Sequence, residues 1–233
     1  MNVLQDLMHL YSSRRFACLF FSLLFTLVAA PVLAALGLGT KTMEAFLALN
    51  ILASILVTLV SFRSYVGLGL LILAIGVRGG YALLGYGPLL MTSQGINVVV
   101  YSVATLVMLR FMLSRGTINS EHIFAALSAY LMIGVICGLM FFIFEEEWPG
   151  SISLQGLASD GSQRVELAHT IYFSFVTLGT LGYGDITPIG GPTRALAVAE
   201  AIGGQMYLAV VVARLVSLYR DRSDLEARDR QEH

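Results

Sequence analysis

The sequence predicts an all-α integral membrane protein with six transmembrane helices and one shorter, membrane-buried helix. Of its 233 residues, 57% are hydrophobic and only 12% are charged. Soluble domains carry about 25% charged residues, so this composition excludes an ordinary soluble fold. Apolar runs of about 20 residues, the length that crosses a bilayer as a helix, recur along the chain.

Six segments have this length and apolarity, namely residues 16–36, 43–62, 65–84, 96–113, 123–144 and 193–219. Two of them contain an ionisable side chain well inside the run: Arg78 in the third and Glu200 in the sixth. Such groups are candidates for function because an unpaired charge in the membrane is costly. Glu44 and Asn50 are possible partners for Arg78. Glu200 has three open interpretations: a hydrogen bond to the short helix, an ion pair, or a protonated structural role.

Basic residues predict the orientation of the chain. They gather on one side of the six segments, which should be the cytoplasmic side, and comprise Arg14, Arg15, Arg63, Arg110, Arg115, Arg220, Arg222, Arg228 and Arg230. We therefore expect both termini in the cytoplasm. We expect residues 1–15 to be a cytoplasmic segment, whose apolar residues at helical spacing fit either an interfacial helix or a frayed terminus. Arg14 and Arg15 before an apolar run also fit a signal peptide, but the run is longer than such peptides need, so an uncleaved span is preferred.

Residues 167–179 are apolar but too short to cross, which predicts a re-entrant helix sheltered by protein. A segment with glycine at alternate positions follows it: Thr180, Leu181, Gly182, Tyr183, Gly184 and Asp185. Gly182 and Gly184 permit the positive φ that a short strand needs to turn all its carbonyl groups to one side. Four such strands around a shared axis supply the cage of about eight oxygens that replaces the water shell of K⁺.

The sequence around these residues reads Y-F-S-x-V-T before the strand and D-I-T-P after it. Over about twenty residues it resembles the selectivity filter of the tetrameric potassium channels. The resemblance implies K⁺ coordination by the backbone carbonyls of Thr180, Leu181, Gly182 and Tyr183, and by the Thr180 hydroxyl. It implies that this filter, residues 180–185, is supported by Gly184, Asp185, Tyr172 and Thr177, with Tyr172 donating a hydrogen bond to Asp185. Leu181 and Gly179 depart from the family pattern, which has Val or Ile and Thr or Ser there.

One filter segment per chain predicts a homotetramer around a central pore. The expected function is passive, K⁺-selective conduction, with K⁺ and membrane lipids as the other partners and no organic cofactor. Two alternatives stay open: a non-selective cation channel, and an auxiliary or sensory subunit that does not conduct. We expect no enzyme, because no nucleophile–base pair or metal cluster stands out. The net charge of −1 gives no reason to expect nucleic acid. The compact chain is typical of a prokaryotic inner membrane protein.

The sequence divides into a voltage-sensor-like domain of four helices, residues 16–113, a pore domain, residues 122–219, and a short cytoplasmic tail, residues 220–233. A voltage sensor needs several charges in its fourth span, but residues 96–113 contain only Arg110. We therefore expect little or no intrinsic voltage dependence.

Two glycines interrupt the last span, Gly203 and Gly204. They fit either a hinge or close packing against the re-entrant helix. One face of the same helix should line a cavity below the filter, with Gln205, Leu208 and Val212 at one-turn spacing.

The outer side carries acidic residues before the re-entrant helix, namely Glu145, Glu146, Glu147 and Asp160. They fit either a device that raises the local cation concentration or a solvated loop.

Overall fold

The computed structural model describes residues 2–36, 42–62, 69, 76, 87–114, 120–155 and 164–229. Helices dominate, as predicted. In chain order the elements are α1 (Asn2–Ala35), α2 (Thr42–Phe62), α4 (Gly87–Met112), α5 (Ser120–Glu147), β1 (Ile152–Leu154), α6 (Leu167–Leu178), β2 (Ile186–Pro188) and α7 (Gly191–Asp229).

Four helices among the described residues are long and apolar enough to cross a membrane, over Arg14–Leu33, Met91–Met112, Ser120–Glu147 and Gly191–Arg214. They correspond to the predicted first, fourth, fifth and sixth spans. The predicted second span coincides with α2, of which the shorter stretch Ala45–Ser54 registers as an apolar helix. Apart from residues 69 and 76, the predicted third span lies outside the described residues, and so does Arg78.

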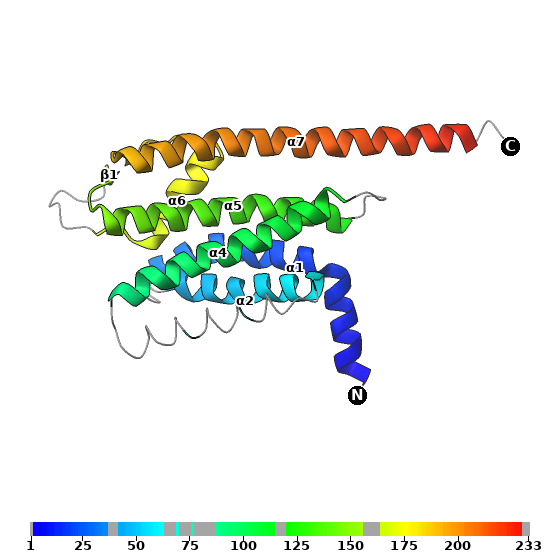
Figure 1. Cartoon of the computed structure of the whole chain (residues 1–233), viewed down its shortest axis with the longest axis horizontal. Coiled ribbons are helices and arrows are strands. Elements are labelled where there is room, and N and C mark those ends of the chain that lie inside the picture. The colour runs from blue at the N-terminus through cyan, green and yellow to red at the C-terminus, as the bar shows by residue number, and fades with distance from the viewer. Residues whose placement is uncertain are drawn as a thin grey trace.

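The helices form an elongated bundle with α5 in the middle (Figure 1). α5 packs against α1 and α4 on one side and against α6 and α7 on the other. β1, β2 and the start of α7 lie at one end of the bundle, and both chain termini lie at the other (Figure 1). α2 ends at the same end as the termini, whereas α4 begins at the opposite end (Figure 1).

Apolar side chains fill the interior between α1, α2, α4 and α5, with Phe16, Leu23, Tyr101 and Met132 among the fully buried ones. Polar bonds add to this packing. Ser22 Oγ of α1 donates to Asn50 Oδ1 of α2 at 2.7 Å, and Tyr101 Oη of α4 donates to the Leu47 carbonyl at 2.9 Å. Because lipid offers no competing hydrogen-bond partners, such bonds help to hold membrane helices together.

The first and last helices each have a part that extends beyond the bundle. α1 contains a break at Arg14, with φ −129° and ψ 24°, and its first part turns away from the bundle (Figure 1). This agrees with a separate helical segment over the first residues. The predicted tail, residues 220–233, is not a separate element as far as Asp229, because α7 continues without interruption to that residue. Strong helix formers such as Leu225 and Ala227 extend it.

Two glycines let α6 approach α5 closely. A Cβ at Gly138 would lie 2.6 Å from Ile171 Cδ1 and 2.9 Å from Ile171 Cα. A Cβ at Gly134 would lie 2.7 Å from a ring carbon of Phe175. Gly134 and Gly138 are one helical turn apart, so together they form a groove in α5 that seats the short helix.

This groove predicts that Gly138→Ala destabilises the protein. The new methyl group meets the Ile171 backbone and cannot be relieved by a rotamer change alone, at a cost of about 1–3 kcal/mol. The measurement is the midpoint of thermal unfolding in detergent. Gly95→Ala is the matched control, because a Cβ there meets nothing within 4 Å. Equal midpoints for the two variants would contradict the role of the groove.

Candidate functional site

The candidate site begins with α6, the short helix that enters the bundle from the end carrying the strands. The backbone N–H of Glu166, just before the helix, donates to His169 Nδ1 at 3.1 Å. Ile171 and Ser174 are buried on the face toward α5, whereas Tyr172 is exposed on another face. α6 ends at Leu178, and Gly179 caps it. The predicted bounds of this helix, residues 167–179, therefore agree with the structure to one residue.

Residues 180–184, after α6, have an unusual backbone. They belong to neither β1 nor β2, and they are called the strand 180–184 below after the short strand that the sequence predicts there. φ is +55° at Thr180, +59° at Gly182 and +79° at Gly184, while Leu181 and Tyr183 have no positive φ. Successive residues thus alternate between left-handed and right-handed backbone conformations. In an ordinary strand successive carbonyl groups point to opposite sides, and an alternation of right-handed and left-handed residues turns them to the same side. The two glycines behave as the sequence predicts.

Thr180 is the unexpected member of this series. A β-branched residue rarely adopts positive φ, and the left-handed region costs an L-residue about 1–2 kcal/mol. Residues held in such conformations cluster at functional sites, where the surrounding structure imposes them. Two hydrogen bonds impose the conformation here: Thr180 N–H donates to the Thr177 carbonyl at 3.0 Å, and Leu181 N–H donates to the Val176 carbonyl at 2.9 Å. Thr177 therefore supports the strand through its backbone.

The outer end of the strand is anchored through Asp185. Tyr172 Oη donates to Asp185 Oδ2 at 2.8 Å, which is the contact that the sequence predicts. Ile186 N–H donates to Asp185 Oδ1 at 3.0 Å, and Gln155 N–H donates to the Asp185 carbonyl at 2.7 Å. Ile186 then opens β2, which pairs antiparallel with β1. Both ends of the five-residue strand 180–184 are therefore fixed to the fold.

The phenol of Tyr172 stays a donor over the physiological pH range. Tyr172 lies outside the four candidate membrane spans. Its hydrogen bond to the Asp185 carboxylate raises the pKa of the phenol to about 12. The proton that makes the contact is thus retained at any pH at which the protein is expected to work.

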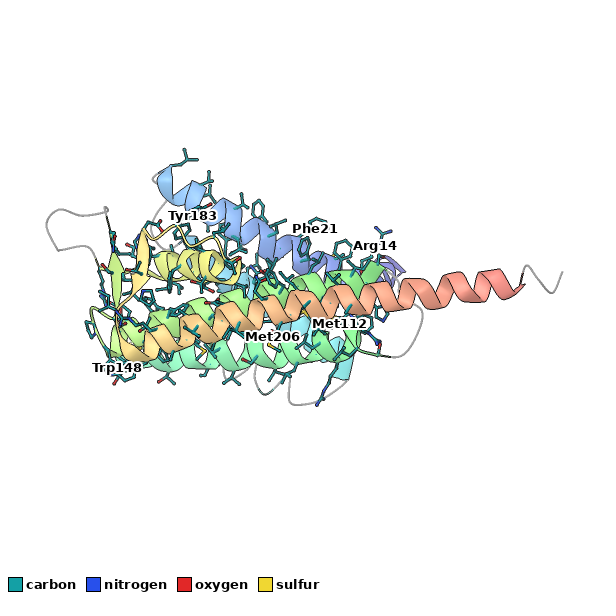
Figure 2. The ribbon with its side chains drawn as sticks, turned by 90° about the horizontal axis from the view of Figure 1, so that it is seen from above. Arg14, Phe21, Met112, Trp148, Tyr183 and Met206 are labelled. Atoms are coloured by element: carbon teal, nitrogen blue, oxygen red, sulfur yellow. The ribbon has the colours of Figure 1, made fainter. Side chains whose placement is uncertain are left out.

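The strand itself is exposed on the surface of the single chain. Thr180, Leu181, Gly182, Tyr183 and Gly184 are all exposed, and the Tyr183 side chain reaches 66% exposure. Figure 2 shows Tyr183 beside α6, in the half of the molecule that holds the strands. Non-helical backbone at membrane depth requires shelter by protein or water, because lipid cannot satisfy its polar groups.

α7 runs past the site as one continuous helix through Gly203 and Gly204. A Cβ at Gly204 would lie 2.7 Å from Leu178 Cδ1 and 3.1 Å from the Leu178 carbonyl oxygen, whereas one at Gly203 would meet nothing within 4 Å. Gly204 therefore serves close packing against the end of α6. The residues predicted to line a cavity, Gln205, Leu208 and Val212, are exposed on α7.

Two ionisable residues of α7, Glu200 and Arg214, make different contacts. Glu200 is 4% exposed, and its Oε1 lies 2.5 Å from the Ser174 hydroxyl of α6. The structure shows the hydrogen bond to the short helix and, among the described residues, no ion pair of Glu200. Ser174 was not among the residues singled out from the sequence. Arg214, near the inner end of α7, donates through Nη2 to the Leu113 and Ser114 carbonyls at the end of α4, at 3.2 and 3.0 Å.

Two of the outer acidic residues have structural partners. The Glu145 carboxylate accepts hydrogen bonds from the Gly150 and Ile152 N–H groups, at 2.8 and 2.9 Å. Glu146 forms an ion pair with Arg164 at 2.7 Å. Glu145 thus caps the turn before β1, and the field of Glu146 is partly neutralised. Asp160 lies outside the described residues.

Part of the chain is similar to known proteins. A family model described as "Ion channel" matches residues 126–221, from α5 to the inner part of α7. Protein LctB of Bacillus caldotenax is 48% identical over 50 residues, covering 22% of this chain and 37% of that protein. Two pore potassium channel c of Oryza sativa subsp. japonica is 30% identical over 100 residues, covering 43% of this chain and 19% of that protein. Potassium channel subfamily T member 1 of Gallus gallus is 32% identical over 88 residues, covering 38% of this chain and 7% of that protein.

The chain thus spans well under two thirds of the length of each of these relatives. No solved structure matches. The matched family is one of channels and not of enzymes, in agreement with the expectation from the sequence. Residues 126–221, which include the strand 180–184, are thus similar to an ion channel domain, in a chain whose described helices include four that are long and apolar enough to cross a membrane.

Proposed function

We propose that the protein is a K⁺-selective channel that conducts passively as a homotetramer, with the strand 180–184 as its selectivity filter. One observation carries the proposal: an exposed five-residue strand whose φ alternates in sign is anchored at both ends to the fold. Two of the relatives are named as potassium channels, which supports K⁺ as the conducted ion.

The tetramer follows from the need to shelter the strand. Its polar backbone is exposed in the single chain and cannot face lipid. Four copies around an axis place the four strands against a shared aqueous pathway instead. The carbonyls of Thr180, Leu181, Gly182 and Tyr183, with the Thr180 hydroxyl, then replace the hydration shell of K⁺.

The neighbouring elements would assist conduction. The carboxyl end of α6 carries partial negative charge from the helix dipole, which favours a cation in the cavity below the filter. In the tetramer the exposed face of α7 that contains Gln205, Leu208 and Val212 would line this cavity. Gating would involve bending or repacking of α7 near Val212 and beyond.

The topology of the chain and its location belong to the same proposal. Six spans would put both termini in the cytoplasm and the outer mouth of the filter on the opposite side. The opposite positions of the end of α2 and the start of α4 support this topology (Figure 1). The membrane would be a prokaryotic inner membrane, with lipids around the outer helices and Arg78 within the third span.

The central test is ion flux in vesicles that contain the purified tetramer. We expect uptake driven by a K⁺ gradient and little uptake driven by Na⁺. Gly182→Ala should abolish it, because Ala pays about 1–2 kcal/mol per chain for the left-handed conformation and four chains share the filter. Gly191→Ala is the matched control, because Gly191 lies at the start of α7 with no atom near its Cβ position.

Other outcomes select the alternatives. Equal K⁺ and Na⁺ flux would replace the proposal with a non-selective cation channel. Assembled tetramers without any flux would indicate a non-conducting auxiliary or sensory subunit. Purified particles without fourfold symmetry would contradict the proposed filter.

The anchor at Asp185 predicts a specific effect of Tyr172→Phe. The variant loses the hydrogen bond to Asp185, worth about 1.5–3 kcal/mol for a charged acceptor, and leaves the outer end of the strand less constrained. We expect a lower ratio of K⁺ to Na⁺ flux. Tyr101→Phe is the control, because it removes a buried phenol bond between α4 and α2. A lowered ratio in both variants would point to general destabilisation.

The composition of α4 predicts conduction with little voltage dependence. Its described residues contain one arginine, Arg110, which is exposed in the last turn. Moving one charge through the field is worth about 2.3 kcal/mol per 100 mV, so a steep response needs several. Single-channel recording in planar bilayers is the measurement. A steep rise of open probability with voltage would contradict the prediction, and Arg78→Gln would then test whether that arginine is the sensor.

A further inference from the structure

A buried carboxyl behind the filter joins three helices. Glu200 of α7 contacts the hydroxyl of Ser174 on α6, with Oε1 2.5 Å from Oγ. The same Oγ lies 2.6 Å from the carbonyl oxygen of Gly134 on α5. All three groups are buried. The Ser174 hydroxyl is therefore the junction between α6, which precedes the filter, and both long helices beside it.

Counting protons at this junction shows which state of Glu200 fits. A serine hydroxyl has one proton to donate and two lone pairs that accept. The Gly134 carbonyl is an acceptor only, so the Ser174 proton is used there. The contact between Ser174 Oγ and Glu200 Oε1 then needs a second proton, which only a protonated carboxyl supplies. An ionised Glu200 would place two acceptor oxygens at this distance or compete with Gly134 for the single proton.

The surroundings of Glu200 support the neutral form. Its Oε2 is buried and has no hydrogen-bond partner of suitable geometry. The titratable groups that face Glu200 are the Cys137 thiol and the Tyr130 phenol, both from α5. The thiol is a weak donor, and the phenol donates instead to the Leu178 carbonyl at 3.2 Å. From α6 the facing group is Ser174, and no cationic side chain among the described residues pairs with Glu200. A buried carboxylate without a cation or donors is costly.

We propose that Glu200 is a positioning residue that holds α6 in place in its protonated form, and that ionisation of Glu200 loosens α6 because the one proton of the Ser174 hydroxyl then serves two acceptors. We call the contact between Glu200, Ser174 and Gly134 the proton latch. The latch is complete below the pH at which the carboxyl ionises and is lost as the pH rises through it. Because α6 imposes the conformation of Thr180 and Leu181, K⁺ flux should fall as the latch opens. This consequence for flux rests on the proposed function.

The protonation state is tested directly by infrared difference spectroscopy of the full-length protein against Glu200→Gln. We expect a protonated-carboxyl band in the wild type at neutral pH that is missing from Glu200→Gln and disappears when the pH is raised. Absence of this band would overturn the proposal whether or not the protein conducts.

The mechanical role is tested by the pH dependence of thermal unfolding. The wild-type midpoint should fall between acidic and alkaline pH. Glu200→Gln, whose amide donates to Ser174 without titrating, should lose that fall. Ser174→Ala should lower the midpoint at acidic pH, where the latch is complete, and Cys137→Ala should keep the fall of the wild type. An unchanged pH dependence in Glu200→Gln would overturn the latch, and loss of the dependence in Cys137→Ala would assign it to the thiol instead.

Flux measured in vesicles between pH 5 and 10 completes the test. We expect wild-type flux to fall about tenfold, as one such hydrogen bond would produce, and the Glu200→Gln flux to change less than about twofold. Equal pH profiles of flux in the wild type and in Glu200→Gln would overturn the link between the latch and conduction. Absence of flux at every pH would refute the proposed function alone, because the infrared and unfolding measurements still decide the latch.

Discussion

A backbone that leaves the helical conformation inside a membrane must have its polar groups satisfied by something other than lipid. In the proposed channel the strand 180–184 is such a backbone, and the elements from α5 to α7 hold it at both ends. The turn bonds from Thr180 and Leu181 to the end of α6 hold its inner end. Tyr172, Gln155 and the pairing of β1 with β2 hold its outer end. The strain at Thr180 is maintained because both ends are fixed.

Holding the strand requires that α6 itself be fixed, and α5 provides most of that support. Gly134 and Gly138 remove the side chains that would keep α6 away. The opposite side of α5 packs on α1 and α4, with Ser128 Oγ bonded to the Phe16 carbonyl at 3.2 Å. α5 therefore lies between α1 and α4 on one side and α6 and α7 on the other. A displacement of α1 or α4 can thus reach α6 through α5.

The inner helix α7 has fewer attachments than the other spans, and each is specific. Gly204 lies against the end of α6, Glu200 contacts Ser174, and Tyr207 Oη donates to the Ala126 carbonyl at 2.6 Å. Arg214 reaches the last carbonyls of α4, where a cation complements the helix dipole. An element held at a few points along one side can change its packing without unfolding the bundle. This arrangement suits a helix that opens and closes a pathway.

The features that depend on neighbouring residues could be predicted from the sequence alone. Apolar length predicted the helices, glycine spacing predicted positive φ at Gly182 and Gly184, and the resemblance to potassium channels implied the contact of Tyr172 with Asp185. The spacing of Gly134 and Gly138 by one helical turn is also visible in the sequence. Which faces of the helices meet is visible only in the fold, because helix rotation and crossing place residues far apart in the sequence side by side. The contacts of Glu200 with Ser174, of Gly204 with Leu178 and of Arg214 with the end of α4 arise in this way, as does the positive φ that the end of α6 imposes on Thr180.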